Sequence, residues 1–127
     1  MKRDMDLVRE LLLKIEGLKE RGGFKDVLPD SINAEGIQKF AEHLHMLIDE
    51  AGLVSGRSAH TVLGKNWLNL RLTWSGHDFL DSIRDPKIWD KTKQGAEAAG
   101  GFTVDLLKDL AKGFVKKQIE EYTGVKL

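Results

Sequence analysis

Hydrophobic residues recur at steps of three and four in three segments of the chain, which is the spacing of a helix with one buried face. The first segment covers residues 4–18, with Asp4 as its predicted N-cap, and the second runs from about 34 to 51 and ends at Gly52. The third spans about 103 to 122. These spacings predict three amphipathic helices, and the apolar surface of the last is wider than one partner face requires.

The stretch after the second helix has the pattern of a β-hairpin. Glycines and an asparagine between residues 55 and 66 are typical of a loop, and beyond them apolar and polar side chains alternate as in a half-buried strand. The apolar members are Leu68, Leu70, Leu72 and Trp74. Thr73 or Ser75 is predicted to cap a further helix that breaks at Pro86.

This order of elements predicts an α+β fold: a winged helix-turn-helix-like domain over residues 1–85, then a helical extension over residues 86–127. Trp74 is expected in the core of the domain, and the small residues 95–101 are expected to form a hinge. The last helix either folds back on the same chain or forms a homodimer contact. The residues predicted for a dimer contact are Leu106, Leu110 and Phe114.

The composition is that of an ordinary globular protein. Of the 127 residues, 41% are hydrophobic and 31% are charged, and no apolar run is long enough to cross a membrane. Cysteine is absent, and the first residues are not followed by the apolar stretch of a signal peptide. We therefore expect a cytoplasmic protein without disulfides.

Charge is balanced over the whole chain but unevenly distributed. Lysine plus arginine equals aspartate plus glutamate, 20 against 20, which weighs against a dedicated DNA-binding protein. Residues 55–72 nevertheless contain basic residues and no acidic one. Such a patch can contact phosphates or enter a minor groove, although hairpin loops are often basic without binding anything. The predicted nucleic-acid contacts are Arg57, Lys65 and Arg71 in the hairpin, with Lys39 and His43 on the second helix.

The second helix has the opposite character, because its acidic residues outnumber its single lysine. A helix that lies among phosphates would be expected to carry positive charge. This acidic face is either a surface for a basic protein partner or an ordinary solvated surface. Its members are Glu35, Glu42, Asp49 and Glu50.

No arrangement of residues indicates an enzyme, a metal site or a cofactor site. His43 and His45 are two positions apart on a helix, so they point to different faces and cannot chelate one metal ion together. The run Ser75-Gly76-His77-Asp78 contains the residue types of a catalytic triad, but adjacent residues cannot converge in space as a triad must. We expect no enzymatic activity and no cofactor.

Three stretches of the sequence are similar to one family of unnamed function. They read Met-Lys-Arg-Asp-Met-Asp-Leu-Val-Arg-Glu-Leu-Leu at the start, Leu-Thr-Trp-Ser-Gly-His-Asp-Phe-Leu-Asp-Ser-Ile-Arg-Asp over residues 72–85, and Gly-Gly-Phe-Thr-Val-Asp-Leu-Leu-Lys-Asp-Leu over residues 100–110. With them, nearly the whole chain resembles the domain-of-unknown-function family 2513, found in bacteria and their phages. This resemblance implies no particular activity.

A second, local resemblance covers residues 39–54. They resemble the recognition helix of arsenic-repressor-type winged-helix regulators, in which Ser-Arg-His-Leu precedes Leu-Leu-x-x-Ala-Gly-Leu-Val. Here the first part reads Ala41-Glu42-His43-Leu44, so the apolar scaffold positions match while the two polar DNA-facing positions differ. The resemblance implies a winged-helix scaffold, and the departure speaks against direct DNA readout by those two positions.

Two functions of different classes remain open at this point. The first is a small DNA-associated regulator, as a monomer or a homodimer, that contacts duplex DNA through its hairpin. The alternative is a protein-binding adaptor or inhibitor, of phage or prophage origin, that docks a partner on the acidic helix and the last helix. Precedent for the scaffold favours the first function, whereas the charge pattern favours the second.

Overall fold

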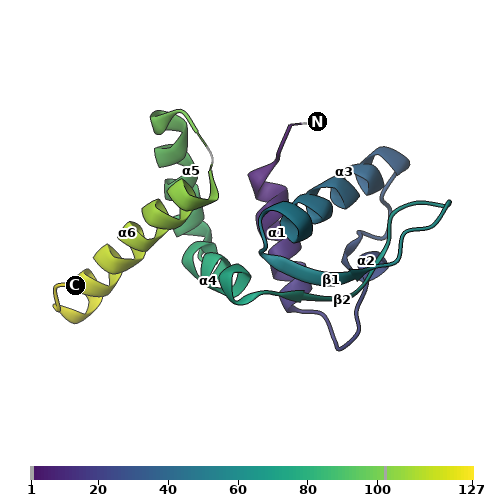
Figure 1. Cartoon of the computed structure of the whole chain (residues 1–127). Coiled ribbons are helices and arrows are strands. Elements are labelled where there is room, and N and C mark those ends of the chain that lie inside the picture. The colour runs from purple at the N-terminus through teal and green to yellow at the C-terminus, as the bar shows by residue number, and fades with distance from the viewer. Residues whose placement is uncertain (1, 102) are drawn as a thin grey trace. The chain divides into compact units, whose positions relative to one another are not determined.

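The computed structural model describes residues 2–101 and 103–127, which form an α+β structure with one small antiparallel sheet (Figure 1). The chain divides into two compact units, and it passes from one to the other within a helix, between His77 and Asp78. We call them unit 1 and unit 2 and describe each by itself. In chain order the elements are α1 (Met5–Glu16), α2 (Phe24–Val27), α3 (Ala34–His45), the π-helix η1 (Met46–Glu50), β1 (Val54–Ser58), β2 (Trp67–Leu72), α4 (Trp74–Ile83), α5 (Pro86–Ala99) and α6 (Val104–Thr123).

Helix α1 supplies much of the core of unit 1, because it packs against α2, α3 and β2. Asp4 is its N-cap as predicted, and the Asp4 carboxylate accepts a hydrogen bond from the Leu7 N–H at 3.2 Å. The helix ends at Glu16, two residues before the predicted end. Its buried residues follow the helical spacing read from the sequence; they are Met5, Leu7, Val8, Leu11, Leu12 and Ile15.

The second predicted helix is two elements, because regular α-helical bonding stops at His45 and one turn of π-helix follows. Gly52 has a φ of +65° and forms the expected left-handed exit. Ile37 has the helical spacing of the inward-facing residues, yet it is exposed. The buried stretch of α3 begins only at Phe40, so the first turn of the helix extends beyond the surface it packs against.

Strands β1 and β2 pair in antiparallel fashion with a β-bulge in the middle. Arg57 pairs with Leu68 and Ser55 pairs with Arg71, so Asn69 and Leu70 together lie opposite one residue of β1. Asn69 takes up the extra length with a φ of +55°, a conformation that asparagine tolerates better than most residues.

The bulge changes which side chains of β2 face the core. Simple alternation predicts Leu68, Leu70 and Leu72 inside. Leu70 and Leu72 are indeed buried, but Trp67 is buried in place of Leu68, which is only half-buried. The Trp67 ring meets Phe24 of α2 edge-on, with ring centroids 5.4 Å apart.

The segment before α2 runs along the free edge of β2. The Leu70 N–H donates to the Gly22 carbonyl at 2.9 Å, and a Cβ added to Gly23 would lie 2.8 Å from the Trp67 carbonyl oxygen. Only glycine therefore fits at residue 23. The short helix α2 was not predicted from the sequence, and its start is held by a hydrogen bond from the Gly23 N–H to the Asp26 carboxylate.

Helix α4 begins where the alternation of β2 stops. Of the two predicted caps, Thr73 is the right one: its hydroxyl accepts from the Gly76 N–H at 3.1 Å, while Ser75 lies inside the helix. The prediction that Trp74 lies in the core is wrong, because this side chain is 83% exposed. β2 ends at Leu72, so the period of two that pointed residue 74 inward no longer applies.

Unit 2 contains a helix pair in place of the predicted hinge. Helix α5 starts with Pro86 behind the Asp85 cap and continues through the small residues to Ala99, and only Gly100 takes a left-handed turn. A Cβ added to Gly95 would lie 3.3 Å from a methyl group of Leu110. The small residues therefore permit close approach of α6 and do not form a hinge.

Helix α6 matches its predicted position within one residue at each end, and it folds back on α5. Ala96, Leu107 and Ala111 are fully buried within unit 2. Ile119 and Tyr122 continue the helical spacing of this apolar face, but both are exposed. The physical reason is length: α6 has 20 residues and α5 has 14, so the last turns of α6 extend past its partner (Figure 1).

Candidate nucleic-acid interface

The hairpin of β1 and β2 carries two arginines on its outer face. Directly paired residues of an antiparallel ladder point to the same side, and the pairs Arg57–Leu68 and Ser55–Arg71 both lie on the side away from the core. Both arginines are exposed, as is Lys65 in the connecting loop. In the part of the chain that the structure describes, none of these three side chains takes part in an ion pair or hydrogen bond.

A third arginine joins this surface from a distant part of the sequence. Arg21, Arg57, Leu68 and Asn69 line one open hollow of about 410 Å³. Arg21 has a φ of +66° and precedes Gly22, whose carbonyl binds the edge of β2. The sequence analysis missed Arg21, because no local signal shows that residue 21 lies beside residue 57. We call Arg21, Arg57, Lys65 and Arg71 the basic hairpin surface.

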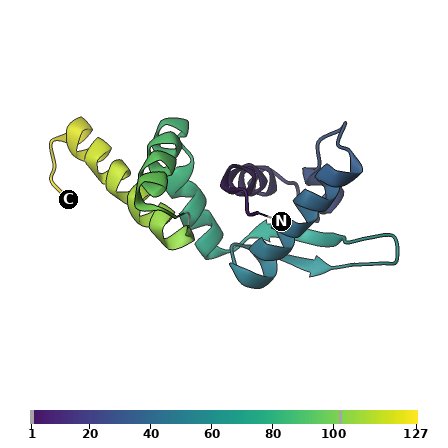
Figure 2. The same cartoon turned by 90° about the horizontal axis from the view of Figure 1, so that it is seen from above.

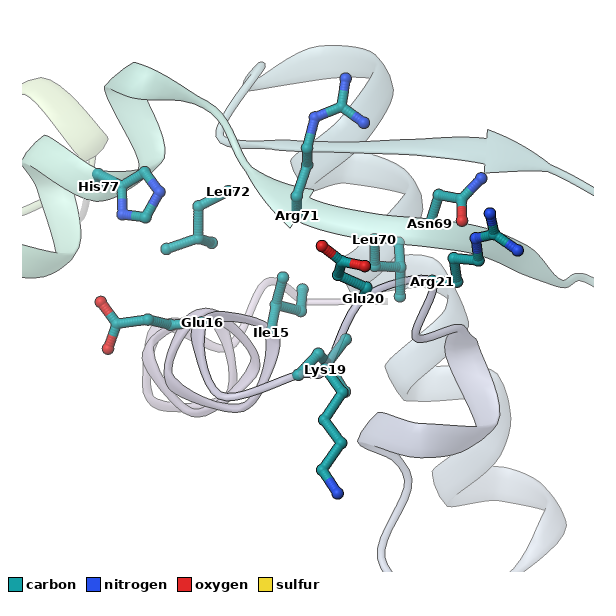
Figure 3. A pocket seen from close by; sticks show the side chains of 11 residues that line it. Ile15, Glu16, Lys19, Glu20, Arg21, Asn69, Leu70, Arg71, Leu72 and His77 are labelled. Carbon is teal, nitrogen blue, oxygen red and sulfur yellow. The ribbon is translucent and has the colours of Figure 1, made fainter.

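A neighbouring hollow of about 460 Å³ has mixed charge. It lies between the end of α1 and β2, and Figure 3 shows the acidic Glu16 and Glu20 among its lining side chains. The Arg71 guanidinium points away from both carboxylates, whereas Arg21 lies beside Asn69 (Figure 3). The basic hairpin surface is therefore bordered by negative charge on the side of α1.

The prediction that His43 contacts nucleic acid is wrong, because its side chain is 0% exposed. Its Nε2 accepts a hydrogen bond from the Asp4 N–H at 2.9 Å, and its Nδ1 lies 2.8 Å from the Lys39 carbonyl oxygen. Because Nε2 is the acceptor, the proton sits on Nδ1 and donates to that carbonyl. His43 thus joins α3 to the start of α1 and has a structural role.

Lys39 is exposed but already has a partner. Its ammonium lies 2.9 Å from the Asp4 carboxylate. The hydrogen bond from Lys39 holds the pKa of the Asp4 carboxyl below its usual value, although partial burial acts in the opposite direction. The positive charge of Lys39 is therefore partly neutralised by Asp4.

The acidic residues of the second predicted helix remain on the surface. Glu35, Asp49 and Glu50 are exposed and Glu42 is half-buried. Asp49 lies 2.7 Å from Nδ1 of His45. Together they make the exposed side of α3 and η1 acidic, as the sequence indicated.

The three residues predicted for a dimer contact are all half-buried within unit 2; they are Leu106, Leu110 and Phe114. Leu110 lies against Gly95 of α5. Part of the wide apolar surface of α6 is thus used inside the same chain, which was the alternative interpretation of its pattern.

Comparison with known proteins supports one family. Residues 2–102 match the model of a family described as hypothetical protein, domain of unknown function 2513. The chain belongs to this family. It is also 28% identical over 120 residues to an uncharacterised protein of Haemophilus influenzae, covering 94% of this chain and 99% of that protein. No solved structure matches the chain.

The family match includes the whole of unit 1 that the structure describes, together with α4 and α5, and it stops before α6. Every residue of the basic hairpin surface therefore lies inside the part of the chain that the family model describes. Among the described residues, none of the helices is both long and apolar enough to span a bilayer. In the same residues, the acidic and histidine side chains form no cluster of three or more suited to a metal ion.

Proposed function

We propose that unit 1 is a winged-helix-like module that binds duplex DNA through the basic hairpin surface, as a small DNA-associated regulator. The order of three helices followed by a hairpin supports the scaffold. The observation that carries the proposal is the gathering of Arg21 and Arg57 around one hollow, with Arg71 on the same hairpin face and no acidic residue between positions 55 and 72.

In this proposal α3 positions the hairpin and does not read bases. Its exposed side is acidic, its histidine is buried and its lysine is paired with Asp4. Phosphate contacts through lysine and arginine give affinity that depends on salt and little on sequence. We therefore expect the protein to bind random duplex DNA at low salt, with an affinity that falls steeply as salt is added.

The test is a titration of the full chain with random duplex DNA at several salt concentrations. Replacing Arg57 and Arg71 by alanine should weaken binding, and the slope of log affinity against log salt should fall by about 0.9 for each lost phosphate contact. Lys112→Ala with Lys116→Ala is the matched control, because it removes the same charge from exposed positions of α6. The control should change affinity by less than about twofold.

Two results would contradict the proposal. One is the absence of binding by the unaltered protein even at low salt. The other is equal loss of affinity in the hairpin variant and the α6 control, which would mean that net charge and not the hairpin surface determines binding.

A second function is supported by the acidic side of α3 and η1. Glu42 and Glu50 lie on that side. The basic residues on the surface of the same helical stretch are Lys39 and His45, and each of them faces a carboxylate in the described structure. A basic protein partner fits such a surface, as an adaptor or inhibitor would need. Changing Glu42 and Glu50 to lysine should abolish capture of such a partner while the circular dichroism spectrum is unchanged. Retained capture would count against the adaptor.

A further inference from the structure

Two large apolar side chains stand fully exposed at the tip of the hairpin. Val62 is 103% and Leu63 is 95% exposed, so neither contributes to the core. Both occupy the turn between β1 and β2, which Figures 1 and 2 show projecting beyond the ends of the two strands. Such turns are usually built from glycine, asparagine, aspartate and proline. The folding of the turn therefore does not explain why these two residues are apolar.

The turn that presents these side chains is well held. Thr61 and Gly64 exchange two backbone hydrogen bonds, at 3.0 and 3.1 Å, and the Leu63 N–H donates to the Thr61 hydroxyl at 3.1 Å. Below them, the Asn66 N–H donates to Nδ1 of His60 at 2.9 Å. A turn held in this way presents Val62 and Leu63 at little further cost in conformational entropy when they bind.

The base of the hairpin is tied to the core as well. The His60 ring packs edge-on against the buried Trp67, with ring centroids 4.8 Å apart. The Ala59 N–H donates to the Asn66 carbonyl at 2.9 Å. The ring contact and the backbone bond therefore anchor the hairpin on the packed part of unit 1.

The charges around the tip indicate what kind of surface would complement it. Lys65 is two residues from Leu63, Arg57 lies on the adjoining strand, and residues 55–72 contain no carboxylate. An apolar tip between cations complements a surface that is apolar inside and negative at its rims. The minor groove of duplex DNA offers such a surface where a base step opens: its floor carries hydrogen-bond acceptors, but the faces of unstacked bases are apolar and two phosphate backbones flank them.

We propose that Val62 and Leu63 form an apolar wedge that enters the minor groove and partly unstacks one base step, while Arg57 and Lys65 bind the flanking phosphates. The wedge rests on the proposed function, because it requires the hairpin to meet duplex DNA. It goes further by assigning the two apolar residues of the tip to a wedge and by naming a deformation of the duplex. Flexible pyrimidine–purine steps such as TA deform most easily, so the wedge favours them.

The experiment compares the full chain with the double variant Val62→Ser/Leu63→Ser. The probe is a short duplex with 2-aminopurine in a central TA step, whose fluorescence rises on unstacking. The unaltered protein should raise the fluorescence, and the variant should not. Affinity should fall about tenfold, because two apolar side chains lose their burial. The salt slope should stay unchanged, because every cation is retained.

Val125→Ser/Leu127→Ser is the matched control, since it makes the same two replacements at exposed positions after α6. This control should bind and unstack as the unaltered protein does. Because the side chains of Val62 and Leu63 are almost fully exposed, the circular dichroism spectrum of the test variant should also match that of the unaltered protein.

The outcomes separate the wedge from the function on which it rests. Salt-dependent DNA binding with no fluorescence change, or with the same change in the Val62/Leu63 variant, overturns the wedge and leaves the proposed function standing. No binding to the duplex at low salt overturns both. Tip-dependent binding to vesicles of phosphatidylserine and phosphatidylcholine, without unstacking of the probe, also overturns the wedge and assigns the tip to a membrane surface.

Discussion

Helix α3 and the β1–β2 hairpin are both surface elements of unit 1, yet they are equipped for different tasks. In the helix the histidine is buried, the lysine is paired and the exposed side is acidic. The hairpin has cations without partners among the described residues, an arginine recruited from residue 21, and an apolar tip. The partners of a charged residue, and not the type of element that carries it, decide whether the residue is available for a ligand.

The largest effect is expected from breaking the structural role of α3. Replacing His43 by alanine leaves a cavity and removes the acceptor of the Asp4 N–H, so the free energy of unfolding should fall by about 2–4 kcal/mol. Urea denaturation, with amide hydrogen exchange of α1, measures this change. His45→Ala is the control, because this histidine is partly exposed and pairs only with Asp49; it should cost less than about 0.5 kcal/mol. Equal effects of the two changes would contradict the assigned role of His43.

The next effect concerns the bulge that shapes the hairpin. Asn69→Val places a β-branched residue at a φ of +55° and should cost about 1–2 kcal/mol, whereas Asn69→Gly should be near neutral. The valine variant should also lose DNA affinity, because Asn69 forms part of the hollow between Arg21 and Arg57. Denaturation and DNA titration of both variants check this. A valine variant as stable as the glycine variant would show that the bulge is not needed.

A smaller effect on DNA affinity is expected from single changes, which compare the two surfaces directly. Arg57→Ala and Lys39→Ala each remove one positive charge, one from the hairpin and one from α3. The arginine change should lower DNA affinity about fivefold at low salt, and the lysine change should stay within about twofold. Binding titrations at matched salt measure both. A larger loss of affinity in Lys39→Ala than in Arg57→Ala would indicate that the interface lies on α3.

The smallest effect is the pH response of the Asp4–Lys39 pair. The folded pKa of Asp4 lies below its usual 3.8, so the pair stabilises the fold fully above that value, and this contribution is lost as the pH falls through the folded pKa. In Lys39→Ala the pKa should move back towards 3.8, because its main cause is removed. Titration of the Asp4 carboxyl by nuclear magnetic resonance follows both proteins. An unchanged pKa in the variant would assign the shift to the backbone bonds instead.

Local signals in the sequence were reliable where an element depends only on its near neighbours. The spacing of apolar residues predicted α1 and α6, and the cap Asp4 and the exit at Gly52 are where the sequence placed them. Thr73 is one of the two caps that the sequence offered for α4. The same signals did not predict the β-bulge of the hairpin. Because of this bulge, Trp67 is buried in the core and Leu68 is not. The small residues of α5 were likewise predicted to form a hinge. In the structure Gly95 instead leaves room for Leu110, which approaches it closely.

Sequence signals alone were enough to predict α1 and α6, the presence of a hairpin, the unequal distribution of charge and the family. The burial of His43, the position of Arg21 beside Arg57 and the exposure of Trp74 became visible only in the folded chain. The physical reason is range. Helix periodicity and capping act over a few residues, whereas His43 meets Asp4 across 39 positions of the chain. Burial and charge pairing depend on such distant contacts, and these exist only once the chain has packed.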